Sequence, residues 1–219
     1  MDSDVRADTC LLYLLRHGAT ENNRDDPPRL QGRRSDTPLS IEGQEQASRT
    51  GRFLASFALD GVFSSPLVRA QQTAAVISEP QGLPLGVVGG LVEVDVGDWE
   101  GRSWEEIRRD DPAAYQAFRD DPCVHPYRGG ENINDVRSRV VPCLEKLMQA
   151  NLGRRIVAVS HGVANRVYLA HLMGVPLASY RSIPQENCGI NLLCHRHGRT
   201  EVITVNGVFH LDRARDRGP

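Results

Sequence analysis

Two histidines in this sequence directly follow apolar runs. The run 11–15 ends in Arg16-His17-Gly18, and the run 156–159 ends in Ser160-His161-Gly162. If both runs are buried strands, each carries a histidine to the sheet edge where ligands of open α/β folds bind. A neutral imidazole can attack phosphorus and form a phosphohistidine, which divides one difficult displacement into two easier ones. We therefore take His17 as a candidate nucleophile, with His161 beside it.

Three further side chains could complete such a site. Arg16 and Arg69 each present a planar fork that can hold two phosphoryl oxygens. With the histidines and the amides at the start of the helix after His161, they would form a pocket suited to a phosphate dianion. Glu93 could protonate the leaving alkoxide and then take a proton from water, which requires its acid form at the working pH. A loop-capping carboxylate is the alternative, because other acidic residues stand close by (Asp95, Asp98 and Glu100).

Strand-like and helix-like segments alternate along the chain. Short apolar or β-branched runs predict strands at 11–15, 61–63, 85–88, 156–159, 190–195 and 201–205. Amphipathic spacing predicts helices over about 41–57, from residue 66 onward, over 134–150 and over 163–173. This order is typical of an α/β fold with a mainly parallel sheet covered on both faces. Loops after parallel strands gather at one edge, which would bring the five candidate residues together.

Boundary residues refine these elements. Ser40 predicts an N-cap, and the inner face of the helix after it carries small and apolar residues (Ala47, Gly51, Leu54 and Ala58). Ser65-Pro66 predicts an N-cap followed by proline at the first helical position, with Arg69 in the first turn. Pro142 should kink the helix 134–150 or mark its real start. Residues 21–37 are charged and contain prolines and a glycine, which predicts a loop.

The chain of 219 residues predicts one domain, 1–219, with a small insertion. Ser103 and Glu106 have capping-box spacing, and Asp111-Pro112 starts another short helix. We interpret this segment as a helical lid insertion over about 102–130.

Composition disfavours several classes of protein. With 26 basic and 28 acidic residues, nothing in the net charge indicates a nucleic-acid partner or an anionic membrane surface. The polar, acidic start does not resemble a signal peptide, and five cysteines without CxxC spacing predict cytosolic thiols, so we expect a cytoplasmic protein. His195 and His197 alternate on a predicted strand, where packing or solvent exposure is a better explanation than a metal site.

Five segments together resemble the histidine phosphatase superfamily, also called the phosphoglycerate mutase-like family. They are Arg16-His17-Gly18-Ala19-Thr20-Glu21, residues 35–40 (SDTPLS), residues 64–74 (SSPLVRAQQTA), Glu93 with residues 97–101 (GDWEG), and residues 159–162 (VSHG). They occur in order over nearly the whole chain, from about residue 12 to 205. The resemblance implies a three-layer α/β/α sandwich.

The resemblance also implies a role for each matching position. His17 resembles the phosphorylated nucleophile and Glu93 the proton donor. Arg16, Arg69, His161 and the adjoining Gly162 resemble the phosphate pocket. Asn23 occupies the position of a family asparagine that reaches the phosphoryl oxygens. Gln31-Gly32 occupies the position of a family loop that lines the pocket. The spacing between Asn23 and Gly32 is two residues longer than is usual in mutases. Members of the family need no metal or other cofactor, because cationic side chains do the work that a metal ion would otherwise do.

Three functions fit these residues. Water would resolve the phosphohistidine in a phosphomonoesterase, and a second substrate hydroxyl would do so in a phosphoglycerate mutase. The compact region 99–158, and Val163 where mutases typically carry asparagine, favour the phosphatase. A non-catalytic phosphate-binding interaction module is the third reading, which the filled catalytic positions disfavour. We expect a small phosphorylated metabolite as the substrate. A homodimer formed through a sheet edge is a further expectation.

Overall fold

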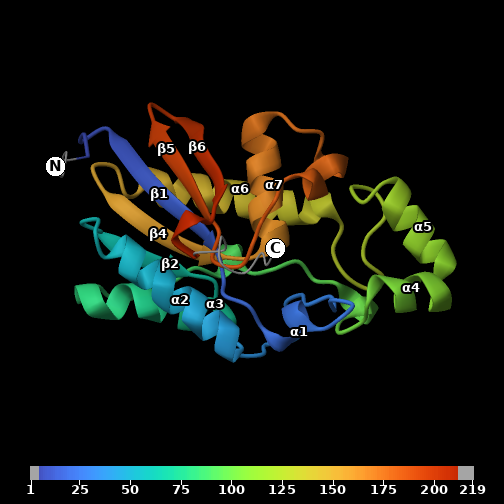
Figure 1. Ribbon diagram of the computed structural model, residues 1–219. Helices are drawn as coiled ribbons and strands as arrows, with labels where there is room; N and C mark the ends of the chain where they lie inside the picture. Colours follow the sequence, from blue (N-terminus) through green and yellow to red (C-terminus); the bar gives the residue numbers. More distant parts are fainter. Residues whose placement is uncertain (1–4, 212–219) are drawn as a thin grey trace.

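A six-stranded sheet organises the protein. The computed structural model describes residues 5–211. Its strand order is β3-β2-β4-β1-β5-β6. The strands span Thr9–Arg16 (β1), Gly61–Ser64 (β2), Leu85–Val87 (β3), Arg155–Ser160 (β4), Ile190–Arg196 (β5) and Arg199–Gly207 (β6). β3, β2, β4 and β1 are parallel, whereas β5 and β6 form an antiparallel hairpin beside β1 (Figure 1). The predicted α/β fold with a mainly parallel sheet is confirmed.

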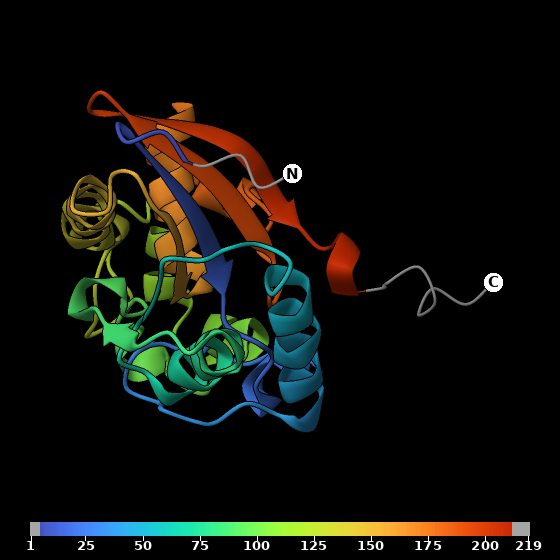
Figure 2. The same ribbon diagram turned by 90° about the vertical axis from the view of Figure 1, so that its left-hand side faces the viewer.

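Alternating side chains of β1 fill two cores, one on each face of the sheet. Leu12 and Leu14 belong to the larger core, and Tyr13 and Leu15 belong to the smaller one. Successive residues of a strand point to opposite faces, so an unbroken apolar run requires cover on both. Figure 2 shows helices on both sides of the twisted sheet. The result is the three-layer sandwich.

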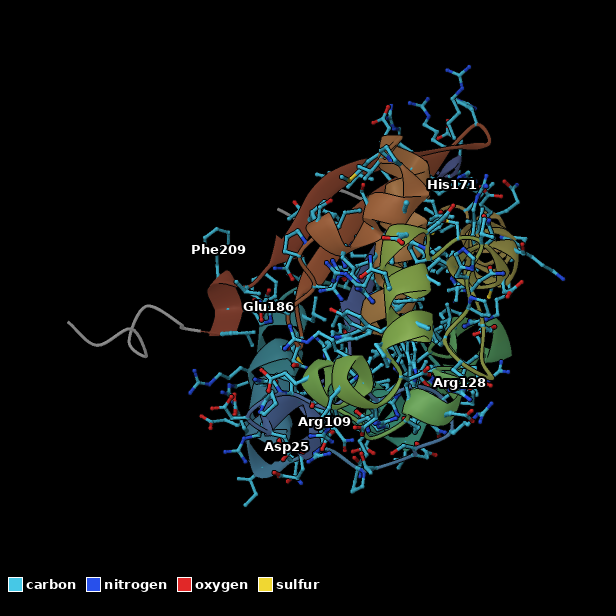
Figure 3. The ribbon with its side chains drawn as sticks, turned by 90° about the vertical axis from the view of Figure 1, so that its right-hand side faces the viewer. Asp25, Arg109, Arg128, His171, Glu186 and Phe209 are labelled. Atoms are coloured by element: carbon cyan, nitrogen blue, oxygen red, sulfur yellow. The ribbon has the colours of Figure 1, made fainter. Side chains whose placement is uncertain are left out.

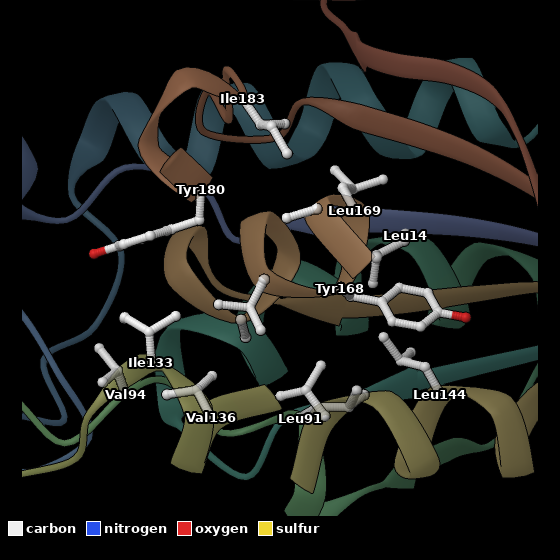
Figure 4. Packing of buried hydrophobic residues seen from close by; sticks show 14 of the residues in the cluster. Leu14, Leu91, Val94, Ile133, Val136, Leu144, Tyr168, Leu169, Tyr180 and Ile183 are labelled. Carbon is white, nitrogen blue, oxygen red and sulfur yellow. The ribbon is translucent and has the colours of Figure 1, made fainter. Parts of the chain in front are cut away.

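The helices divide between these two cores. α2 (Ile41–Leu54) and α3 (Val68–Ser78) cover the face with the smaller core. α6 (Ile133–Gln149) and α7 (Gly162–Met173) cover the other face, where Leu144, Tyr168 and Leu169 pack against Leu14 and its neighbours (Figure 4). Short 3-10 turns complete the elements: η1 (Glu79–Gln81), η2 (Gly89–Leu91), η3 (Gly97–Trp99), η4 (Leu177–Ser182) and η5 (Phe209–Leu211). Within residues 5–211, no helix combines the length and apolarity that a membrane span requires.

The segment predicted as a lid contains two short helices, α4 (Trp104–Asp110) and α5 (Pro112–Asp120). Ser103 accepts a hydrogen bond from the Glu106 amide while Glu106 accepts one from the Ser103 amide, as the capping box requires. Figure 1 shows both helices at one end of the molecule, beyond the carboxyl end of β1. Buried aromatic rings, among them Trp99, Phe118 and Tyr127, join this segment to the larger core.

Three local predictions were wrong. Residues 21–37 are not all loop, because α1 (Glu21–Arg24) forms where the Asn23 side chain accepts from the Thr20 amide. Helix α2 ends at Leu54, so Ala58 lies outside it and is exposed. Helix α3 begins at Val68, and Ser65 is therefore not its N-cap. For Pro142, only one of the two predicted alternatives is excluded: it does not mark the start of α6, which begins at Ile133 after the Asn132 cap and contains Pro142 in its interior.

Candidate active site

The register of β1 on β4 places the two candidate histidines side by side. Arg16 pairs with Ser160 at the ends of these parallel strands, and the His17 amide donates to the Ser160 carbonyl at 3.0 Å. His17 and His161 therefore leave adjacent strands at the same level, with ring centroids 5.1 Å apart. The repeated pattern of apolar run, histidine and glycine is thus explained by the pairing of its two strands.

His17 is held in a defined tautomer. Its Nδ1 lies 2.7 Å from the Gly18 carbonyl oxygen, which can only accept, so Nδ1 carries the proton. Nε2 is then the nitrogen with the free electron pair, and the Nε–H of Arg69 donates to it at 3.3 Å. Burial first, and then the positive charges of Arg69 and Arg16, hold the pKa of His17 well below its usual value of 6.5. The imidazole is therefore neutral near pH 7.

His161 is fully buried and held by a serine. Its Nε2 lies 2.7 Å from the Ser65 hydroxyl, and its Nδ1 has no hydrogen-bond partner among the described residues. Burial, followed by the charges of Arg69 and His17, also places the pKa of His161 well below 6.5. A buried polar atom without a partner is costly, so its presence next to the other histidine indicates a site for a ligand oxygen.

Two arginines flank this pair. Arg69 is fully buried, and its Nη atoms donate to the carbonyls of Ser35 and Gly32, each at 2.9 Å. Arg16 donates from Nη1 to the Gln185 carbonyl at 2.8 Å, whereas its buried Nε has no partner in the described part of the chain. Burial lowers the pKa of Arg16 to about 10, so it stays charged at neutral pH. This second orphan donor again indicates an anion.

Glu93 lies at the amino end of α7, with 5 % of its surface exposed. Its Oε1 accepts from the Val94 and Ala164 amides at 2.9 and 3.1 Å, and its Oε2 accepts from the Val163 amide at 3.1 Å. Because His161 is the N-cap of α7, this carboxylate lies directly beside the histidine pair. Oε2 accepts only one hydrogen bond and thus retains an electron pair that can hold a proton.

Arg139 fixes the backbone that carries Glu93. Its guanidinium donates to the carbonyls of Gly90, Val92 and Glu93 at 3.2, 2.7 and 3.1 Å. It also forms a bidentate pair with Glu131 at 3.0 and 3.1 Å. One side chain of α6 thereby holds three carbonyls of the segment that runs from η2 to Glu93.

The remaining predicted binding residues lie in the loop after β1. Asn23 Oδ1 accepts from the Thr20 amide and from the Asn187 side chain, each at 3.2 Å, and Asn187 also donates to the His17 carbonyl at 3.0 Å. Gln31 bonds Thr20 and Thr37 rather than the histidines. Gly32 contributes its carbonyl to Arg69 and its amide to Glu100. Gly162 is the first residue of α7, and a Cβ built on it would lie 3.5 Å from Arg16 Nε.

The structure thus brings Arg16, His17, Arg69, Glu93 and His161 together, as predicted. Four contributing residues were missed: Ser65, Arg139, Gln185 and Asn187. The sequence predicted Ser65 only as a helix N-cap, not as a partner of His161. The one signal for a role in the site was its place in the segment Ser64-Ser65-Pro66, which belongs to a family motif. The other three contribute through contacts far apart in the chain, for which the sequence gives no local signal.

Comparison with known proteins identifies the family. The sequence pattern of the histidine phosphatase superfamily (branch 1) matches residues 12–207. This chain belongs to the histidine phosphatase superfamily. Phosphoserine phosphatase 1 of Hydrogenobacter thermophilus is 30% identical over 200 residues, which are 91% of this chain and 93% of the relative. The probable phosphoglycerate mutase GpmB of Salmonella choleraesuis is 28% identical over 206 residues, covering 92% and 94% of the two chains.

Solved structures of the superfamily have the same fold. The phosphoserine phosphatase of Entamoeba histolytica in complex with 3-phosphoglyceric acid superposes with a TM-score of 0.82 at 29% identity, covering 92% of this chain and 99% of that one. A putative α-ribazole-5'-P phosphatase of Escherichia coli also has a TM-score of 0.82, at 26% identity, with 90% and 96% coverage. These histidine phosphatase structures confirm the predicted fold family, and their names differ in substrate.

Proposed function

We propose that this protein is a phosphomonoester hydrolase that acts on a small phosphorylated metabolite through a phosphohistidine on His17. The observation that carries the proposal is the neutral His17, protonated on Nδ1 toward Gly18, with its Nε2 beside the Nε–H of Arg69 and the charge of Arg16 acting on the same ring. Such an imidazole is a competent nucleophile at neutral pH without a separate base.

In the first step, His17 Nε2 attacks phosphorus and the bond from phosphorus to the ester oxygen breaks. Glu93, in its acid form, gives its proton to the departing alkoxide. The buried donors of Arg16 Nε and His161 Nδ1 would take up phosphoryl oxygens, and their positive environment stabilises the charge that develops there. Ser65 Oγ accepts from the Leu67 amide and can donate its own hydrogen to His161 Nε2, and in that tautomer the ring proton lies on Nδ1.

In the second step, water attacks the phosphohistidine while the Glu93 carboxylate takes its proton. The bond between phosphorus and nitrogen breaks, inorganic phosphate forms and Glu93 returns to its acid form. Cationic side chains neutralise the phosphoryl charge in both steps, so the scheme requires no cofactor.

A phosphoglycerate mutase is the second candidate, and its support is the likeness to the mutase GpmB. The hydrolase is favoured by Val163, which offers no polar side chain at the first turn of α7, and by the compact segment 99–158.

Two incubations separate the candidates. The protein is mixed with p-nitrophenyl phosphate and EDTA, and separately with 3-phosphoglycerate and catalytic bisphosphoglycerate. Phosphate release from the aryl ester supports the hydrolase. Formation of 2-phosphoglycerate without net phosphate release would show a mutase instead, and a folded but inert protein would indicate a phosphate-binding module.

A further inference from the structure

A third arginine lies next to the phosphate pocket and is not used by the proposed chemistry. Arg166 follows Gly162 by one turn of α7, and long helical side chains lean toward the amino end of their helix. A Cβ built on Gly162 would lie 3.3 Å from Arg166 Nη1 and 3.5 Å from Arg16 Nε. The two guanidinium groups therefore approach each other across this glycine.

Arg166 is oriented by a single hydrogen bond. Its Nε–H donates to the Ile183 carbonyl at 2.8 Å, which fixes the plane of the guanidinium. Between residues 5 and 211, neither of its Nη atoms meets an acceptor at hydrogen-bond distance. The outer edge of the fork is thus oriented and available, although the side chain is half-buried.

The charges around this pair leave room for one more anion. Arg166 and Arg69 repel Arg16, while the carboxylates of Glu93 and Glu186 attract it, so the three arginines outnumber the two carboxylates. Figure 3 shows Glu186 at the face that also carries α4 and α5. Like charges held close together are unfavourable unless an anion binds between them. The Arg16 Nε in the phosphate pocket and the Arg166 fork beside it would meet two anionic groups of one ligand.

We propose that Arg166 binds a carboxylate that the substrate carries a few bonds from its phosphoester. The inference rests on the proposed function and narrows its substrate to phosphorylated hydroxy acids or hydroxy amino acids. A carboxylate matches the two parallel donors of a guanidinium fork. A second phosphate fits less well, because its larger charge would meet the Glu186 carboxylate, which already attracts Arg16. The names of the relatives agree, since phosphoserine and 3-phosphoglyceric acid both carry such a carboxylate.

The test compares O-phosphoserine with O-phosphoethanolamine, which differ only in the carboxylate. In the wild-type protein we expect kcat/KM for phosphoserine to exceed that for phosphoethanolamine by about 10- to 100-fold, the size of a charge-assisted interaction. In Arg166→Gln this ratio should fall to about one. The ratio cancels any loss common to both esters, including the loss of the bond to Ile183. Arg137→Gln, which removes an exposed cation of α6, should leave the ratio unchanged.

Binding separates this inference from the proposed function. The same two esters are titrated by calorimetry into His17→Ala and into His17→Ala with Arg166→Gln. Tighter binding of phosphoserine that is lost with Arg166 supports the inference, even if neither ester were hydrolysed by the wild type. Equal affinity for both esters, or a preference that persists in Arg166→Gln, would overturn it, and hydrolysis of p-nitrophenyl phosphate would then leave the phosphatase proposal standing.

Discussion

Replacing the Glu93 carboxylate by an amide tests whether this side chain supplies the proton. In Glu93→Gln, the amide oxygen at the Oε1 position keeps the bonds from Val94 and Ala164. The amide nitrogen then faces the Val163 N–H, so one of three hydrogen bonds is lost. We expect the free energy of unfolding to fall by about 1–3 kcal/mol, with the site otherwise intact.

The kinetic effect should depend on the leaving group. A general acid contributes about 10²–10⁴-fold when it protonates a poor leaving group. We therefore expect kcat/KM for the best alkyl phosphate substrate to fall by about that factor in Glu93→Gln. p-Nitrophenolate departs with little protonation, so kcat/KM for p-nitrophenyl phosphate should fall less than about 10-fold. Steady-state phosphate release on the two esters measures both values.

A surface variant controls for the change from acid to amide. Glu145 lies on α6 with its side chain 48% exposed. Glu145→Gln should leave both kinetic values at the wild-type level. Equal losses on alkyl and aryl esters in Glu93→Gln would refute the acid role and indicate that Glu93 serves only to accept hydrogen bonds from the first amides of α7.

Three further predictions concern the surroundings of the site. Because the pKa values of His17 and His161 lie well below 6.5, the unfolded chain takes up more protons once the pH falls below about 6.5. The free energy of unfolding, measured in urea, should therefore be lower at about pH 5.5 than at about pH 6.5, by about 1 kcal/mol for each of the two histidines. In His17→Ala, the free energy of unfolding should decline less steeply over the same pH range. Arg139→Met should lower kcat/KM for alkyl phosphates more than for aryl phosphates because the Glu93 segment loses its anchor; equal losses would show a merely structural role. Ser65→Ala should lower kcat by about 10-fold because His161 loses the bond that orients it, whereas wild-type turnover would contradict this positioning.

Chain order and residue pattern were enough to predict the sheet and the centre of the site. An apolar run such as 11–15 can be buried only between two layers, and the side chains of β1 do alternate between two cores. The two histidines could be placed together because parallel strands end at one edge, and the pairing of Arg16 with Ser160 confirms that reasoning.

Side-chain partners at a distance could not be predicted. Ser65 precedes a proline and fits an N-cap pattern, yet its hydroxyl bonds His161 and the helix begins three residues later. Arg139 lies 46 residues from the carbonyl of Glu93 that it holds, and only the packing of α6 against that segment reveals the contact. The roles assigned to the site residues remain predictions that the variants above would test.

The most direct test of the central claim is to trap the phosphorylated enzyme. Wild-type protein is mixed with substrate, quenched in alkali within one turnover and digested, and the phosphorylated residue is identified by mass spectrometry. We predict a phosphoryl group on His17, formed at least as fast as turnover and absent in His17→Ala. Phosphate release in single turnovers with no phosphorylated residue, or phosphorylation of a residue other than His17, would contradict it.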